Sequence, residues 1–169
     1  GSNGGATFPS FENVQFVNNV FSYSGSMGII YNWSTDNSDV KFTNNTFVGN
    51  GLYLSGVNNY AGNPGPVFEN NIFYKSIPVG GQNCTFNNNI TYSGTNSNEL
   101  IYSGNPGSTG GANLIGQDPQ FVDFPIAGAV FDYSQDLNLN PSSPAIGSGV
   151  AGADMGITGG SAPFDVGAN

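Results

Sequence analysis

Charge is scarce in this sequence, and positive charge most of all. Only 8% of the 169 residues are charged, the basic ones are Lys41 and Lys75, and histidine is absent. Eleven acidic residues give a formal net charge of −9 at pH 7. Nucleic acids and anionic membranes are bound by positively charged surfaces. The composition therefore argues against both as partners.

Long apolar runs and helical periodicity are also missing. The longest apolar stretches cover a few residues, whereas a membrane-spanning helix needs about 20, so membrane insertion is not expected. No segment sustains a 3.6-residue apolar period, which argues against helical repeats. Cys84 has no second cysteine to pair with inside the chain, so the redox compartment stays open. Few lysines among many asparagine, serine, threonine and glycine residues are typical of exported proteins.

What the chain does contain is a repeated phrase rich in asparagine and phenylalanine. It reads "FVNNVF" at 16–21, "FTNNTF" at 42–47, "FENNIF" at 68–73 and "FNNNIT" at 86–91. The opening phenylalanines are 26, 26 and 18 residues apart. Each phrase predicts a short strand, an asparagine corner and a second short strand. A third strand is expected in each repeat, at 28–31, 51–54, 76–79 and 99–102.

Three short strands per repeat predict a parallel β-solenoid, in which each strand pairs with its equivalent one coil away. Asparagine tolerates the left-handed backbone of a tight corner, and its amide both donates and accepts hydrogen bonds. One asparagine per coil, stacked about 4.8 Å apart, can therefore bond to the next. We predict this structural ladder at Asn18, Asn44, Asn70 and Asn88, or at their neighbours Asn19, Asn45, Asn71 and Asn89. The alternative, glycan attachment at the sequons of Asn32, Asn44, Asn83 and Asn89, is disfavoured because a buried corner would hide most of them.

The phrase resembles the right-handed parallel β-helix superfamily that includes pectate-lyase-like proteins. The stretches "ANLIGQDPQFVD", "DLNLNPSSPAIGSG" and "ADMGITGG" within 112–160 resemble the closing coils of secreted and surface proteins of the Bacteroidota type. The resemblance implies an all-β, right-handed solenoid of about six coils over 1–169, with 122–169 as closing coils and cap. Residues 1–10 are read as partly tag or linker. It implies little about activity, because this fold carries lyases, hydrolases, adhesins and spacers.

Alternation separates inward from outward side chains on the predicted strands. The expected core comprises Val14, Phe16, Phe21, Val40, Phe42, Phe47, Phe68, Phe73, Cys84 and Phe86. Two outward columns are expected. The first consists of Gln15, Lys41, Val67 and Thr85, and the second of Val17, Thr43, Glu69 and Asn87. Lys41 and Glu69 lie diagonally across neighbouring coils, an exposed arrangement that implies no catalysis.

Four aromatic residues are the candidate carbohydrate-binding residues. Tyr74 and Tyr92 fall in one outward column of adjacent coils, while Trp33 and Tyr60 lie in the two long loops. Exposed aromatic rings offer sugar rings an apolar face; the alternative is that the two tyrosines shield a loop. Asp36 and Asp39 form a weak calcium candidate because they lack a suitably spaced bidentate glutamate. No other metal or cofactor is expected.

Catalysis has little support in the sequence. A polyuronate lyase needs arginine, lysine or metal ions to neutralise its substrate, and here the only basic residues are two lysines in different coils. A glycoside hydrolase needs two carboxylates about 5–9.5 Å apart, and none pair in the repeat frame. Asp118 and Asp154 are interpreted as structural, while the geometry around Asp132 and Asp136 is left open.

The sequence thus favours a non-catalytic extracellular or cell-surface module that binds polysaccharide or a cell-surface glycan, or is adhesive. The alternatives are the C-terminal portion of a polysaccharide-degrading lyase or hydrolase, and a structural, self-assembling spacer. The repeats begin close to residue 11 with no amphipathic helix before them. An uncovered first coil predicts either a missing preceding domain or end-to-end contact with another molecule.

Overall fold

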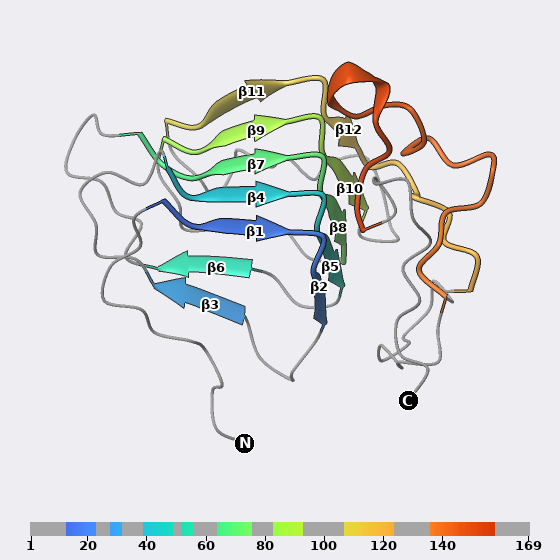
Figure 1. Ribbon diagram of the computed structural model, residues 1–169, viewed down its shortest axis with the longest axis horizontal. Coiled ribbons are helices and arrows are strands. Elements are labelled where there is room, and N and C mark those ends of the chain that lie inside the picture. The colour runs from blue at the N-terminus through green and yellow to red at the C-terminus, as the bar shows by residue number, and fades with distance from the viewer. Residues whose placement is uncertain are drawn as a thin grey trace.

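The computed structural model describes residues 13–22, 28–31, 39–48, 52–55, 64–75, 83–92, 107–123 and 136–157. These residues form an all-β structure whose short strands stack in parallel (Figure 1). The first sheet consists of β1 (Gln15–Val17), β4 (Lys41–Thr43), β7 (Val67–Glu69), β9 (Thr85–Asn87) and β11 (Thr109–Gly111), in that order. The second sheet consists of β2 (Val20–Ser22), β5 (Thr46–Val48), β8 (Ile72–Tyr74), β10 (Ile90–Tyr92) and β12 (Leu114–Ile115).

The register confirms the repeat inferred from the phenylalanines. Phe16 pairs with Phe42, Phe42 with Phe68 and Phe68 with Phe86. A further coil follows, in which Gly110 pairs with Phe86. The chain passes from the first sheet to the second within each coil, so the two sheets rise together as expected for a β-solenoid (Figure 1).

The third side of the stack is described for two coils. There β3 (Gly28–Tyr31) pairs in parallel with β6 (Leu52–Ser55). The strand at 28–31 is confirmed, whereas the one expected at 51–54 lies one residue later, because Gly28 pairs with Leu52. The strands expected at 76–79 and 99–102 lie outside the described residues.

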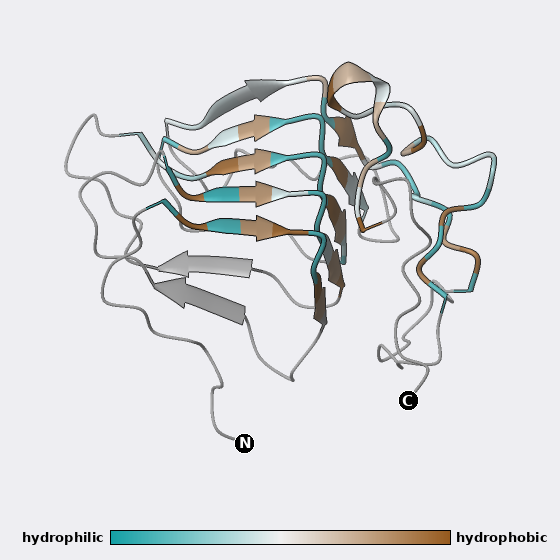
Figure 2. Ribbon diagram, in the orientation of Figure 1, coloured by the Kyte–Doolittle hydropathy of each residue, from teal (hydrophilic) through white to brown (hydrophobic). Residues whose placement is uncertain are grey.

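The two asparagines of each corner have different roles, which decides between the two predicted ladders: the one at Asn18, Asn44, Asn70 and Asn88 is wrong, and the one at their neighbours is confirmed. The first one, at Asn18, Asn44, Asn70 and Asn88, has a left-handed backbone with φ between 52° and 56°. The hydrogen-bonded ladder runs instead through the second one, at Asn19, Asn45, Asn71 and Asn89, and continues to Asn113. The physical reason is geometric: the left-handed residue makes the turn, and the next side chain then points along the stack. Figure 2 shows the polar corner as a line between the two sheets.

The side-chain amide of each interior ladder asparagine donates two hydrogen bonds and accepts two, as Asn71 shows. Asn71 Nδ2 donates to Asn89 Oδ1 at 2.9 Å and to Phe42 O at 2.8 Å. Its Oδ1 accepts from Asn45 N at 2.9 Å and from Asn45 Nδ2 at 3.0 Å. Because Asn45, Asn71 and Asn89 are fully buried, these bonds satisfy groups that water cannot reach.

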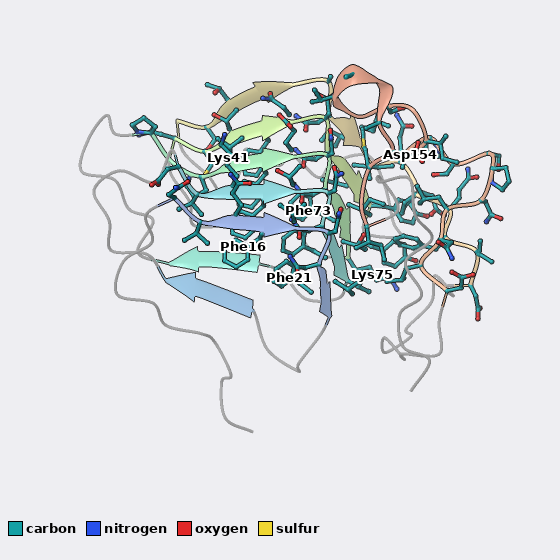
Figure 3. All side chains as sticks on the ribbon, viewed as in Figure 1. Phe16, Phe21, Lys41, Phe73, Lys75 and Asp154 are labelled. Carbon is teal, nitrogen blue, oxygen red and sulfur yellow. The ribbon has the colours of Figure 1, made fainter. Side chains whose placement is uncertain are left out.

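The predicted core is confirmed between the sheets. Seven of its members are buried there, with Val14, Phe16 and Phe21 partly buried against them. Phenylalanine rings of successive coils stack with centroids 4.6–4.9 Å apart. Figure 3 shows Phe16, Phe21 and Phe73 in this stack. No helix among the described residues is long and apolar enough to cross a membrane.

Candidate ligand-binding faces

The tyrosine column predicted for carbohydrate exists, but it is not exposed as expected. Tyr92 pairs with Tyr74 in adjacent coils, and their ring centroids lie 5.7 Å apart. Tyr74, however, is only 1% exposed and packs against Phe121 with centroids 5.6 Å apart. Tyr92 is half-buried. The prediction of a Tyr74–Tyr92 stacking platform is therefore wrong, because a segment from later in the chain covers Tyr74.

The covering part of the chain comprises Phe121, which packs on Tyr74, and residues 136–157, which are called the strap. Together with Phe121 the strap covers the outer side of the second sheet, forming a second apolar cluster that the repeated phrase does not predict (Figure 1). The buried members are Val48, Ile72, Tyr74, Ile90, Phe121, Leu137, Ala145, Met155 and Ile157. The signal was available in strands such as "IFY" at 72–74, which are apolar at successive positions. Such strands are typical of sheets buried on both sides.

Hydrogen bonds to the coils hold the strap in place. Val150 N donates to Asn70 Oδ1 at 2.9 Å, and Asn88 Nδ2 donates to Ser148 O at 3.1 Å. The first asparagine of these two corners thus recognises the strap near its 3-10 turn η1 (Val150–Gly152). Farther along, Ile157 N donates to Thr46 Oγ1 at 3.1 Å.

Gly156 marks the closest approach of the strap to the sheet. Its φ is +78°, and a Cβ there would lie 2.5 Å from Ile72 Cδ1 and 2.8 Å from Thr46 Oγ1. Only glycine fits such a close approach with this backbone. The strap is therefore seated against the second sheet and leaves no room for a ligand between them at this point.

Burial also shifts the ionisation of two groups. Burial, with a smaller contribution from the negative charge of Asp118, raises the pKa of Tyr74 to about 12. Burial likewise raises the pKa of Cys84 to about 12. Since a thiol reacts as the thiolate, Cys84 behaves as the small core residue predicted for it.

The remaining predicted site residues are only partly described. Trp33, Tyr60 and Asp36 lie outside the described residues. Asp39 accepts a hydrogen bond from Asn13 N through Oδ2 and so ties the first coil to the second. Among the described residues, no group of three or more histidine, cysteine or acidic side chains could hold a metal ion.

Several carboxylates bind backbone amides. Asp118 Oδ1 accepts from Gln120 N, Asp136 Oδ1 from Asn138 N and Asp154 Oδ1 from Gly147 N, at 2.8, 2.9 and 2.8 Å. Figure 3 shows Asp154 on the strap. These contacts agree with the structural roles interpreted for Asp118 and Asp154, and they give Asp136 the same role. Asp132 lies outside the described residues.

The outward side of the first sheet, called the open face, differs from the covered side of the second sheet. Its two columns are Gln15, Lys41, Val67, Thr85, Thr109 and Val17, Thr43, Glu69, Asn87, Gly111. All ten positions are exposed or half-buried, with Val17 44% exposed. Hydroxyl and amide groups predominate, and Lys41 and Glu69 carry the charge. Lys41 is labelled on β4 in Figure 3.

The last coil of this face was missed in the sequence. "STGGANLI" at 108–115 aligns with "CTFNNNIT" at 84–91 in the structure, because Asn113 continues the ladder and Thr109 pairs with Thr85. Gly110 and Ala112 replace the phenylalanine and the first asparagine on which the alignment depended. The recurring threonine and second asparagine were the signals that remained.

Comparison with known proteins gave no match, whether with family models, curated proteins or solved structures.

Proposed function

We propose that this chain is a non-catalytic extracellular module that binds a neutral or weakly charged polysaccharide along the open face. The observation that carries the proposal is the contrast between the two sheets. The strap covers the outer side of the second sheet, whereas the outer positions of the first sheet remain exposed or half-buried. A rigid face of this kind is where a long, regular ligand has room to lie.

The chemistry of the open face suits sugar hydroxyls. Threonine hydroxyls and the amide of Gln15 both donate and accept hydrogen bonds, and strand spacing repeats such groups about every 4.8 Å. Val17 and Val67 add small apolar areas for sugar C–H groups. A net charge of −9 disfavours polyuronates by repulsion.

The non-catalytic part of the proposal is supported by the carboxylates. Asp118, Asp136 and Asp154 each accept a hydrogen bond from a backbone amide, which is a structural role. A glycoside hydrolase needs two carboxylates on either side of the scissile bond. We further propose that the stack is a right-handed parallel β-helix of the pectate-lyase-like type. Crossovers between parallel strands are right-handed in about 98% of cases, which supports this handedness.

Affinity gel electrophoresis tests the proposal. Neutral β-glucan, xyloglucan and galactomannan cast into native gels should retard the parent protein, whereas polygalacturonate should not. Thr85→Glu places a negative charge on β9 of the open face and should abolish retardation. Val122→Glu is the matched control, because Val122 is 52% exposed and lies outside the open face. If no neutral polysaccharide retards the parent, the proposal is wrong. If Thr85→Glu is retarded as much as the parent, the polysaccharide binds elsewhere than on the open face.

A further inference from the structure

The strap contains a compact loop, residues 146–154, whose two ends are held together. Met155 N donates to Ala145 O at 2.9 Å, and both of these residues are fully buried against the second sheet. Inside the loop, Gly149 N donates to Ala153 O at 2.7 Å. Compact surface loops whose ends are close are Ω-loops, which frequently carry function. This segment is called the strap loop.

The strap loop lies at the corner beside the open face. Val150 N donates to Asn70 Oδ1 at 2.9 Å, and Asn70 directly follows Glu69, the open-face residue at the end of β7. Asn88, which directly follows β9, donates through Nδ2 to Ser148 O at 3.1 Å. Figure 1 shows η1 near the end of β9. The strap loop therefore borders the second outward column of the open face.

Two apolar side chains of the strap loop are left at the surface. Ile146 is 39% exposed and Val150 is 41% exposed, and neither belongs to the apolar cluster beneath the strap. Ala151 is also exposed, and its φ of +57° is a strained backbone conformation for alanine. Strained residues on well-anchored loops are concentrated at binding sites. The loop thus holds an apolar side chain in a fixed position beside the polar groups of the open face.

We propose that the strap loop is a second contact surface for the polysaccharide, on which Val150 packs against the face of a sugar ring. The inference rests on the polysaccharide binding proposed above and adds the class of sugar. At the end of the open face, the Glu69 carboxylate accepts hydrogen bonds and the Asn87 amide group donates them. These groups suit the hydroxyls at the rim of a sugar ring, whereas Val150 suits its C–H groups.

An apolar contact of this kind selects sugars whose ring faces carry only C–H groups. In β-linked glucose and xylose units every hydroxyl is equatorial, so both faces of the ring are apolar. Mannose units have an axial hydroxyl, which makes one face polar. A hydroxyl pressed against Val150 would lose its hydrogen bonds to water without replacement, which weakens binding. The ligand class is therefore a β-linked glucan or xylan and not a mannan.

Affinity gel electrophoresis of the parent and four variants tests the inference. Mixed-linkage β-glucan should retard the parent more than galactomannan does at equal concentration. Val150→Thr keeps the shape but adds a hydroxyl, so it should weaken retardation by β-glucan several-fold and bring it near that by galactomannan. Val150→Glu should weaken it further, whereas Val150→Leu should keep the preference for β-glucan. Val122→Glu, at a valine that is 52% exposed and outside both surfaces, is the control and should behave as the parent.

The outcomes distinguish this inference from the proposed function. Because the side chain of Val150 is exposed, all variants should keep the thermal midpoint of the parent. If neither β-glucan, xyloglucan nor galactomannan retards the parent, the proposed function and this inference are both wrong. If β-glucan retards the parent and the threonine and glutamate variants equally, the ligand does not touch the strap loop, and this inference alone is wrong. Equal retardation of the parent by β-glucan and galactomannan would overturn the sugar class.

Discussion

The outer sides of the two sheets are built on strands of similar length in the same coils, but their chemistry differs. On the second sheet, Ile72 and Tyr74 point outward and are buried beneath the strap and Phe121. On the first sheet, Val67 and Glu69 of the same coil point outward and are half-buried. Strand geometry alone therefore does not decide which side of a coil is available to a ligand.

Two features of the sequence decide it instead. The outward positions of the second sheet are mostly apolar, as at Val48, Ile72, Tyr74 and Ile90, so covering them lowers the free energy of the folded state. The corner residues Asn70 and Asn88 supply the hydrogen bonds that position the strap over them. The first sheet has outward threonines and charged residues, which remain hydrated at little cost.

The largest difference is expected from truncating one outward side chain on each sheet of the same coil. Ile72→Ala should lower the free energy of unfolding by about 2–5 kcal/mol, because a cavity forms between sheet and strap. Val67→Ala should cost about 0.5 kcal/mol, as at a surface position. Urea denaturation of the two variants measures both values. Similar losses would mean that the strap does not cover Ile72 in solution.

The corner between the sheets allows a second, somewhat smaller comparison. Asn45→Ala should cost about 3 kcal/mol, because it leaves buried ladder groups without partners. Asn44→Ala should cost about 1 kcal/mol, because alanine is strained at a φ of 54°. Asn44→Gly, which removes this strain, is the control. A greater loss of unfolding free energy for Asn44→Ala than for Asn45→Ala would mean that the first asparagine of each corner, and not the second, forms the ladder.

The smallest effect concerns ionisation beneath the strap. The pKa of Tyr74 is raised to about 12 in the folded protein, whereas it is about 10 in the unfolded chain. The folded state therefore holds the phenol proton more tightly than the unfolded state does. The stability that this provides is complete below pH 10 and is lost as pH rises toward 12. Denaturation of parent and Tyr74→Phe across this range should show a steeper decline for the parent. Parallel declines would contradict burial of Tyr74.

The repeated phrase was enough to predict the coil frame and the inward residues, because phenylalanine and asparagine recur together at fixed positions. It was not enough to assign the ladder, since both asparagines suit a corner and only backbone geometry distinguishes them. The burial of Tyr74 could not be read from its own coil, because Phe121, which packs on it, is far along the chain. The fifth coil was missed since Gly110 and Ala112 lack the side chains used for alignment.

Successive ladder residues are separated by 26, 26, 18 and 24 positions, yet they bond in the same way. The alignment of successive coils is therefore set at the asparagine corners and does not depend on the number of residues between them. Insertions and deletions that fall away from the corners can accumulate without shifting any strand. A new recognition loop could be introduced in the shortest interval, between Asn71 and Asn89. The longer intervals of the neighbouring coils show that the stack accommodates the extra length.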